Sequence, residues 1–168
     1  MSQRISGYAR EANDRYETPE WVTLALIPHI PPIKTVWEPA CGSGKMIRAL
    51  QTAGFEVIGS DIAGGVDFLK QTMRQSDAII TNPPYTLAAE FIVKARALAP
   101  LVCMLLRTDY DHAKSRRYLF GDCRQFAKKV VLTRRIVWFE DERAAPSFNH
   151  AWFVWDAYHA GPPILACA

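Results

Sequence analysis

Apolar and polar residues alternate along the chain in blocks that predict short strands separated by helices. Apolar runs predict strands at 35–38, 55–59, 78–81, 101–107, 130–133 and 151–155. Amphipathic stretches predict a first helix capped by Thr18, followed by helices at 45–52, 87–98 and 113–120. This alternation is typical of an α/β fold with a doubly wound, mostly parallel sheet covered on both faces. We expect the aromatic strand at 151–155 to be antiparallel.

The chain has no internal repeat and no dividing linker, which predicts a single domain over residues 1–168. Residues 1–15 are polar and without periodicity, so we expect a flexible arm that orders on binding. Between the second and third strands we expect at most a brief extended piece at 66–68.

Cysteines and histidines are scattered without the spacing of a disulfide framework or a zinc site. We therefore expect a cytoplasmic protein that holds no metal. The first 20 residues lack the apolar run of a secretory leader, and no apolar run is long enough to cross a bilayer.

Positive charge is concentrated between Arg107 and Arg135, where nine basic residues stand against three acidic ones. This segment carries a net charge of +6, although the whole chain carries only +3. Such an excess suits a polyanionic partner, with Arg107, Arg116 and Arg117 as candidate contacts. A solvated helix face explains the same pattern equally well.

A glycine-containing turn, EPACGSG at residues 38–44, stands where a predicted strand passes into a helix. Its glycines allow the backbone to approach a ligand, and the helix start offers free N–H groups. A phosphate-binding P-loop would need glycine at Pro39 and serine or threonine at Met46, and a dinucleotide site would need a third glycine at Ile47. A lone turn of this kind is more often only a turn, but the acid before it, Glu38, and the acid after the next strand favour a ligand site.

Two acidic positions follow the next predicted strand. Asp61 stands 17 residues beyond Gly44, at the position where a carboxylate of a parallel sheet accepts both ribose hydroxyls of an adenosine. Asp67 would then accept the adenine amino group, and Phe68 would cover the adenine ring. We expect these side chains and the glycine turn to share one site.

The sequence Asn82-Pro83-Pro84-Tyr85 comes directly after the strand at 78–81, at the same edge of the sheet. The prolines fix the backbone and remove two N–H donors. The Asn82 side-chain oxygen and the Pro83 carbonyl would hold both hydrogens of an arylamine, which localises the nitrogen lone pair toward a methyl donor. Tyr85 would stack on the flat acceptor group.

These motifs, in this order and preceded by YETP at residues 16–19, resemble the amino-group methyltransferases with a Rossmann-like class I catalytic domain. The resemblance is greatest to adenine-N6 DNA methyltransferases of the gamma motif order, and it covers residues 16–107. It implies S-adenosylmethionine as cofactor, DNA as partner, and Asn82, Pro83, Pro84 and Tyr85 as the catalytic acceptor pocket. Phe148 would stack on a flipped base, a role for which Trp138, Phe139 and Trp152 compete.

The resemblance also assigns the cofactor-binding residues. The methionine part and its surroundings would be held by Thr18, Glu38, Pro39, Ala40, Cys41, Gly42 and Gly44. The nucleoside part would be held by Asp61, Ile62, Asp67 and Phe68.

Sequence-reading members of this family carry a separate target-recognition domain, for which this chain has no room. Recognition would come from the basic segment, the N-terminal arm, or a partner subunit, such as a second copy of the chain, or there would be no sequence recognition. The alternatives are methylation of an adenine or guanine amine in RNA, methylation of a glutamine side-chain amide in a protein, and a non-catalytic nucleic-acid-binding protein.

Overall fold

The computed structural model describes residues 17–138 and 148–168, so the arm predicted over residues 1–15 lies outside the described residues. The helices are α1 (Glu20–Leu26), α2 (Lys45–Thr52) and α3 (Ala88–Leu98). The strands are β1 (Thr35–Glu38), β2 (Glu56–Gly59), β3 (Ala78–Thr81), β4 (Leu101–Arg107), β5 (Phe126–Val131), β6 (His150–Asp156) and β7 (Ile164–Cys167). Short 3₁₀ turns are η1 (Ile27–His29), η2 (Ile62–Gly64), η3 (Phe68–Lys70), η4 (Tyr85–Leu87), η5 (Tyr110–His112) and η6 (Lys114–Leu119).

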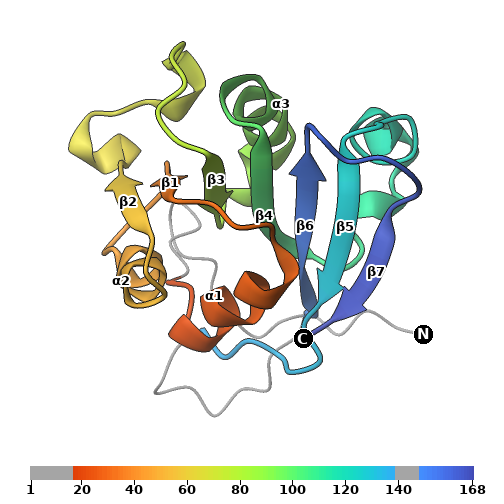
Figure 1. Cartoon of the computed structure of the whole chain (residues 1–168), viewed down its shortest axis with the longest axis horizontal. Helices are drawn as coiled ribbons and strands as arrows, with labels where there is room; N and C mark the ends of the chain where they lie inside the picture. The colour runs from red at the N-terminus through yellow and green to blue at the C-terminus, as the bar shows by residue number, and fades with distance from the viewer. Residues whose placement is uncertain (1–16, 139–147) are drawn as a thin grey trace.

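The strands of the described residues form one sheet in the order β2-β1-β3-β4-β6-β5-β7, which Figure 1 shows running from β2 at one side to β7 at the other. β1, β2, β3 and β4 are parallel to one another. β6, the predicted aromatic strand, is antiparallel to both of its neighbours. The predicted α/β class and the antiparallel aromatic strand are therefore confirmed.

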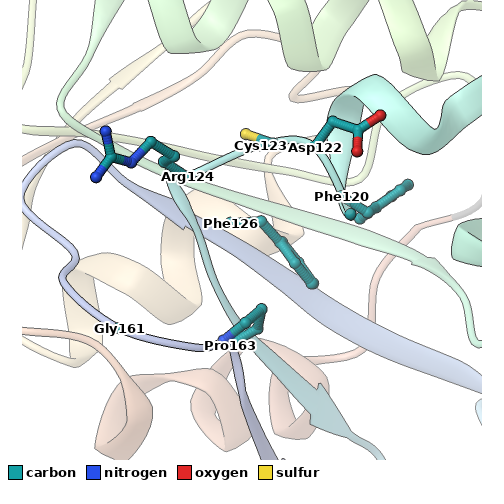
Figure 2. Close-up of a pocket in the computed structure, with 8 residues that line it drawn as sticks. Phe120, Asp122, Cys123, Arg124, Phe126, Gly161 and Pro163 are labelled. Carbon is teal, nitrogen blue, oxygen red and sulfur yellow. The ribbon is translucent and has the colours of Figure 1, made fainter.

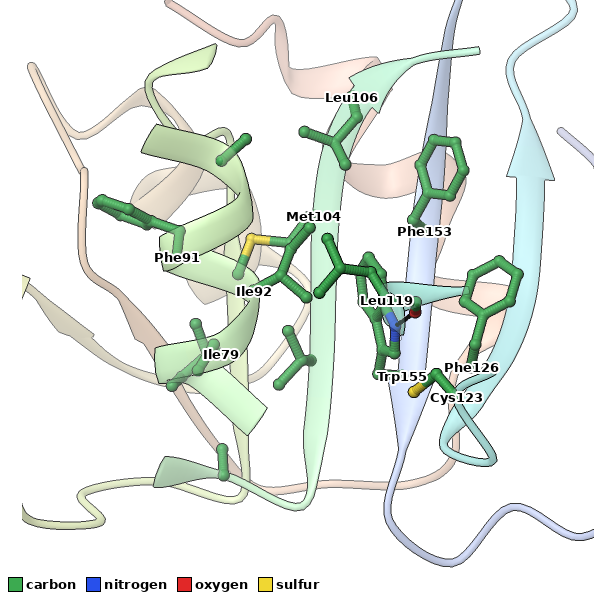
Figure 3. Packing of buried hydrophobic residues seen from close by; sticks show 14 of the residues in the cluster. Ile79, Phe91, Ile92, Met104, Leu106, Leu119, Cys123, Phe126, Phe153 and Trp155 are labelled. Carbon is green, nitrogen blue, oxygen red and sulfur yellow. Dashed lines mark hydrogen bonds between the residues drawn. The ribbon is translucent and has the colours of Figure 1, made fainter. Parts of the chain in front are cut away.

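Each face of the sheet is covered by helices. β4 is buried on both faces, which explains why its sequence is apolar almost throughout. Its even-numbered residues Met104 and Leu106 pack toward α3, η6 and Phe120 (Figure 3). Its odd-numbered residues Cys103 and Leu105 pack toward α1 and α2. Because successive side chains of a strand point to opposite faces, a strand buried on both sides needs apolar residues at every position.

Several expected local structures differ in the molecule. Pro19, not Thr18, is the N-cap residue of α1, because its ψ of 147° is extended and the helix begins only at Glu20. In the piece expected to be extended at 66–68, Asp67 has an extended backbone, but Phe68 already begins the 3₁₀ turn η3, which Asp67 caps by accepting a hydrogen bond from Leu69 N–H at 3.0 Å.

The carboxyl-terminal third contains the remaining differences. The expected helix at 113–120 is the 3₁₀ turn η6, since this stretch has no apolar stripe at helical spacing. β5 begins at Phe126 rather than at 130, and β7 was not predicted. β7 pairs with β5 in parallel and extends the sheet beyond it.

Candidate active site

The carboxyl ends of β1, β2 and β3 lie at one edge of the sheet, because these strands are parallel and adjacent. A cleft of about 1610 Å³ opens at this edge. Sites for drug-sized ligands usually measure about 300–1,000 Å³, so this cleft has room for two ligands side by side. Its lining includes the residues that follow each of the three strands, among them Gly42, Asp61 and Asn82.

The glycine turn and the loop after β2 are joined by Asp61. Its two carboxylate oxygens accept hydrogen bonds from Gly42 N–H at 3.0 Å and from Ala63 N–H at 2.8 Å. A carboxylate has about four lone-pair positions, so two acceptor sites are left for a ligand. Gly44 has a φ of +83°, which favours glycine, and ends the turn where α2 begins.

Ile47 explains how α2 packs on the sheet without a third glycine in the turn. A Cβ at Gly59 would meet Cδ1 at the flexible end of Ile47, so glycine in β2 allows Ile47 to keep its present rotamer against the strand. In a dinucleotide-binding fold the third glycine of the motif lies in the helix and allows close helix–strand packing. In this chain the helix carries Ile47 at that position, and the glycine, Gly59, lies in the strand β2.

Glu38 places a carboxyl group at the floor of the cleft with only 1% of its surface exposed. Burial is the main cause that raises the pKa of Glu38 to about 8, with a smaller contribution from the negative charge of Asp61 and opposing contributions from hydrogen bonds with Thr81 and Ala40. The Glu38 Oε1 atom accepts a hydrogen bond from Ala40 N–H at 3.1 Å, which holds the start of the turn. At neutral pH this carboxyl is therefore mostly protonated, and a cationic ligand nearby would favour its ionised form.

Charged residues around the glycine turn are predominantly acidic. The acidic and basic side chains of the cleft are Glu17, Glu38, Lys45, Asp61 and Asp67, of which Glu38 is mostly uncharged at neutral pH. Lys45, the cation among them, pairs with Glu17 at 3.4 Å. A hydrogen bond with Ser43, followed by the effect of Lys45, lowers the pKa of Glu17. This half of the cleft suits a cationic ligand better than a phosphate.

The loop after β3 forms another wall of the same cleft. Asn82, Pro84, Thr86 and Leu87 contribute to the lining. Pro84 precedes η4 with a φ of −57°, and its carbonyl accepts a hydrogen bond from Leu87 N–H at 2.9 Å. The fixed proline backbone therefore holds Asn82 between β3 and this turn.

Most of the residues predicted to bind cofactor lie along this cleft. Its lining includes Thr18, Glu38, Pro39, Ala40, Cys41, Gly42, Asp61, Ile62, Asp67 and Phe68. Phe68 is only 2% exposed and packs edge-on against Trp37, so little of its ring is accessible to a ligand. Gly44, Pro83 and Tyr85 are not part of the lining, although each is next to a residue that is.

The aromatic candidates for stacking on a base occupy different environments. Trp138 lines the cleft. Phe148 does not, and Arg107 stacks over its ring at 3.9 Å. Trp152 is fully buried and donates a hydrogen bond to the Val22 carbonyl at 2.8 Å, so it is wrong as a stacking residue. Phe139 lies outside the described residues.

The basic segment is partly neutralised within itself. Each of its three acids pairs with one of its cations: Arg107 with Asp109 at 2.7 Å, Lys129 with Asp111 at 2.7 Å, and Arg117 with Asp122 at 3.0 Å. Arg116 stacks over the Tyr110 ring at 3.9 Å. Arg107, Arg116 and Arg117 are therefore held by contacts within the protein and lie outside the cleft lining.

A second cavity of about 460 Å³ lies beside β5 and the loop before β7 (Figure 2). Figure 2 shows that the Arg124 side chain extends away from the Phe126 ring. None of the predicted site residues lines this cavity. The described residues contain no group of side chains suited to a metal ion, and none of their helices is long and apolar enough to cross a membrane.

Three features of the cleft were not predicted from the sequence. Glu17, Ser43 and Lys45 contribute to it; Glu17 and Ser43 lie inside the predicted motifs YETP and EPACGSG but were given no role of their own, and Lys45 directly follows the second motif. Trp138 was named only as a competitor of Phe148. His150, whose imidazole lies 2.9 Å from the Tyr85 hydroxyl, had no sequence signal.

No family model and no curated protein matches the chain. Solved structures do share its fold. A protein of Pyrococcus horikoshii provisionally described as an RNA methyltransferase superimposes with a TM-score of 0.62 at 15% identity, over 92% of each chain. A protein of Listeria monocytogenes provisionally described as a class I S-adenosylmethionine-dependent methyltransferase gives 0.57 at 11% identity, over 89% of this chain and 62% of its own.

The type IIG restriction endonuclease BpuSI superimposes with a TM-score of 0.58 at 13% identity. The match covers 86% of this chain but only 24% of the endonuclease. The fold is therefore the Rossmann-like fold of class I methyltransferases. This chain spans less than two thirds of the length of the Listeria monocytogenes protein and of the endonuclease.

Proposed function

We propose that this chain transfers the methyl group of S-adenosylmethionine to an exocyclic amino group, with adenine-N6 in DNA as the favoured acceptor. The observation that carries the proposal is the common cleft, in which the glycine turn and Asp61 face the same space as Asn82 and Pro84. A methyl transfer needs a donor and an acceptor in contact, and the cleft volume suits two ligands.

The chemistry of the cleft fits S-adenosylmethionine. The cofactor carries positive charge on its sulfonium and its ammonium group, and the residues around the glycine turn are mainly acidic. Asp61 has acceptor positions left for the two ribose hydroxyls. Bound there, the cofactor supplies an activated methyl group.

The acceptor side would act by orientation. The Asn82 side-chain oxygen and the Pro83 carbonyl would accept the two hydrogens of the amino group, so that the nitrogen lone pair points at the sulfonium methyl. The nitrogen–carbon bond forms as the carbon–sulfur bond breaks, and the methylated nitrogen then loses a proton to solvent. Positioning of this kind supplies about 7–11 kcal/mol in well-oriented reactions.

An amino group of adenine or guanine in RNA is the second candidate acceptor. The specific observation in its favour is the fold likeness to the Pyrococcus horikoshii protein, which covers 92% of both chains. The restriction endonuclease BpuSI provides the corresponding support for DNA.

The test is a transfer assay with methyl-labelled S-adenosylmethionine and three acceptor pools, which are DNA, RNA and glutamine-containing peptides. Mass analysis of the product then identifies the methylated atom. We expect label in adenine of DNA. Label in RNA or peptide would show that this molecule, and not DNA, is the acceptor. A chain that binds no S-adenosylmethionine would overturn the whole proposal.

Asn82→Ala tests the acceptor role separately. We expect it to bind cofactor as the parent does and to lose about 10²-fold in turnover, because the amino group is no longer positioned. Asn149→Ala is the matched control, since Asn149 is exposed and does not line the cleft. Parent-like turnover of Asn82→Ala would show that the acceptor pocket is misassigned.

A further inference from the structure

His150 is a buried polar residue beside the acceptor loop. It is the first residue of β6, it pairs with Arg107 of β4, and it is only 5% exposed. Its Nε2 atom forms a hydrogen bond of 2.9 Å with the Tyr85 hydroxyl. A buried imidazole without such a partner would destabilise the fold, so the contact explains why a polar residue is tolerated here.

The same imidazole also contacts the aromatic ring that lines the cleft. Trp138 packs edge-on against His150, with ring centroids 5.2 Å apart and an interplanar angle of 82°. The Tyr85 ring lies 6.3 Å from it at 44°. His150 therefore contacts two aromatic residues that are 53 positions apart in the sequence.

The charge state of His150 agrees with a structural rather than an acid–base role. Burial, followed by the positive charge of Arg107, lowers the pKa of His150 to about 4. At neutral pH the ring is uncharged. Since His150 does not line the cleft, it reaches a ligand only through its neighbours.

We infer that His150 is a positioning residue for the acceptor, which anchors Tyr85 through its hydroxyl and supports Trp138 from the side. The inference rests on the proposed function. Tyr85 lies three residues after Asn82, with its ring packed against the core beneath α3. The hydrogen bond to His150 holds the hydroxyl end of the Tyr85 side chain, and so it also fixes the direction of the loop at 82–85 where it leaves β3. A planar heteroaromatic acceptor then meets preformed walls, and less ordering is needed when it binds.

The experiment is a double-mutant cycle on the full chain, with the acceptor identified by the transfer assay. His150→Leu removes the polar contact, and Tyr85→Phe removes only the hydroxyl. We expect each to raise the KM for the acceptor about tenfold with cofactor affinity close to the parent value, and we expect Tyr85→Phe to lower the melting temperature because it leaves the buried imidazole without this partner. The double variant should be no worse than either single variant, because the two changes break one contact.

His150→Gln is the conservative control, since its amide can replace the imidazole as hydrogen-bond partner of Tyr85. We expect it to recover most of the acceptor affinity. Additive losses in the double variant, or a His150→Gln variant as impaired as His150→Leu, would overturn the positioning role. A parent chain that binds cofactor but methylates none of the acceptor pools would instead overturn the proposed function, and the inference with it.

Discussion

Replacing Glu38 by glutamine tests the electrostatics of the cleft floor. The substitution keeps the size of the side chain and the oxygen that accepts the Ala40 N–H, and it removes the ionisable group. In the parent, burial raises the pKa of Glu38 from the usual 4.5 of a glutamate to about 8. A carboxyl whose pKa is higher in the folded chain destabilises that chain wherever the unfolded chain is ionised.

The sign and size of the effect follow from this difference. Below pH 4.5 the carboxyl is protonated in both states, and Glu38 has no electrostatic cost. Its cost increases as the pH rises from 4.5 and becomes constant above about 8. At 1.36 kcal/mol per pKa unit, the difference between 4.5 and about 8 corresponds to about 5 kcal/mol above pH 8, and to about 3 kcal/mol at pH 7.

Urea unfolding followed by circular dichroism at pH 5, 7 and 9 measures this effect. We expect the free energy of unfolding of Glu38→Gln, relative to that of the parent, to rise by about 2 kcal/mol from pH 5 to pH 7 and by about 4 kcal/mol from pH 5 to pH 9. Glu90→Gln, which removes an exposed carboxyl from α3, is the control and should follow the parent curve. A Glu38→Gln difference that stays constant from pH 5 to 9 would refute the reasoning, because Glu38 would then titrate equally in both states.

Three further outcomes follow from the site. Asp61→Ala should weaken S-adenosylmethionine binding about tenfold or more in calorimetry, because a hydrogen bond to a charged group is worth about 1.5–3 kcal/mol; an unchanged affinity would exclude the ribose role. Gly59→Ala should lower the free energy of unfolding by about 0.5–1.5 kcal/mol in urea titrations, because the flexible end of Ile47 has to leave its rotamer, and adding Ile47→Val, which removes that end, should relieve this strain. If the double variant is no more stable than Gly59→Ala, the strain does not come from Ile47. Trp138→Ala should raise the acceptor KM more than Phe148→Ala in steady-state kinetics, since Trp138 alone of the two lines the cleft; the opposite ranking would favour Phe148.

The sequence predicted the central strands well because their pattern reflects burial directly. β1, β3 and β4 have the predicted bounds, and each apolar run ends at the turn residues that follow it. The common edge of the sheet was also predictable, since parallel neighbours bring their carboxyl ends together.

Long-range contacts account for what the sequence did not show. Lys128 and Lys129 interrupt the apolar pattern of β5, yet they belong to the strand. Their ammonium groups reach the His29 carbonyl at 2.6 Å and Asp111 at 2.7 Å. β7 is mostly exposed, so burial left little pattern in its sequence.

The contact of His150 with the acceptor loop was missed for a similar reason. His150 and Tyr85 are 65 positions apart, and only the antiparallel pairing of β6 with β4 brings His150 to this end of the sheet. Neither residue type nor local spacing carries that information.

The two packed layers on either side of β4 contain one buried thiol each, which makes the layers separately observable. Cys103 lies on the α1 and α2 side, and Cys123 lies on the α3 and η6 side. Burial raises the pKa of the Cys103 thiol far above its usual range, so alkylation of Cys103 requires that layer to open. Comparing the labelling rates of the two cysteines, with and without a cofactor, would therefore reveal whether the layers come apart together or one at a time.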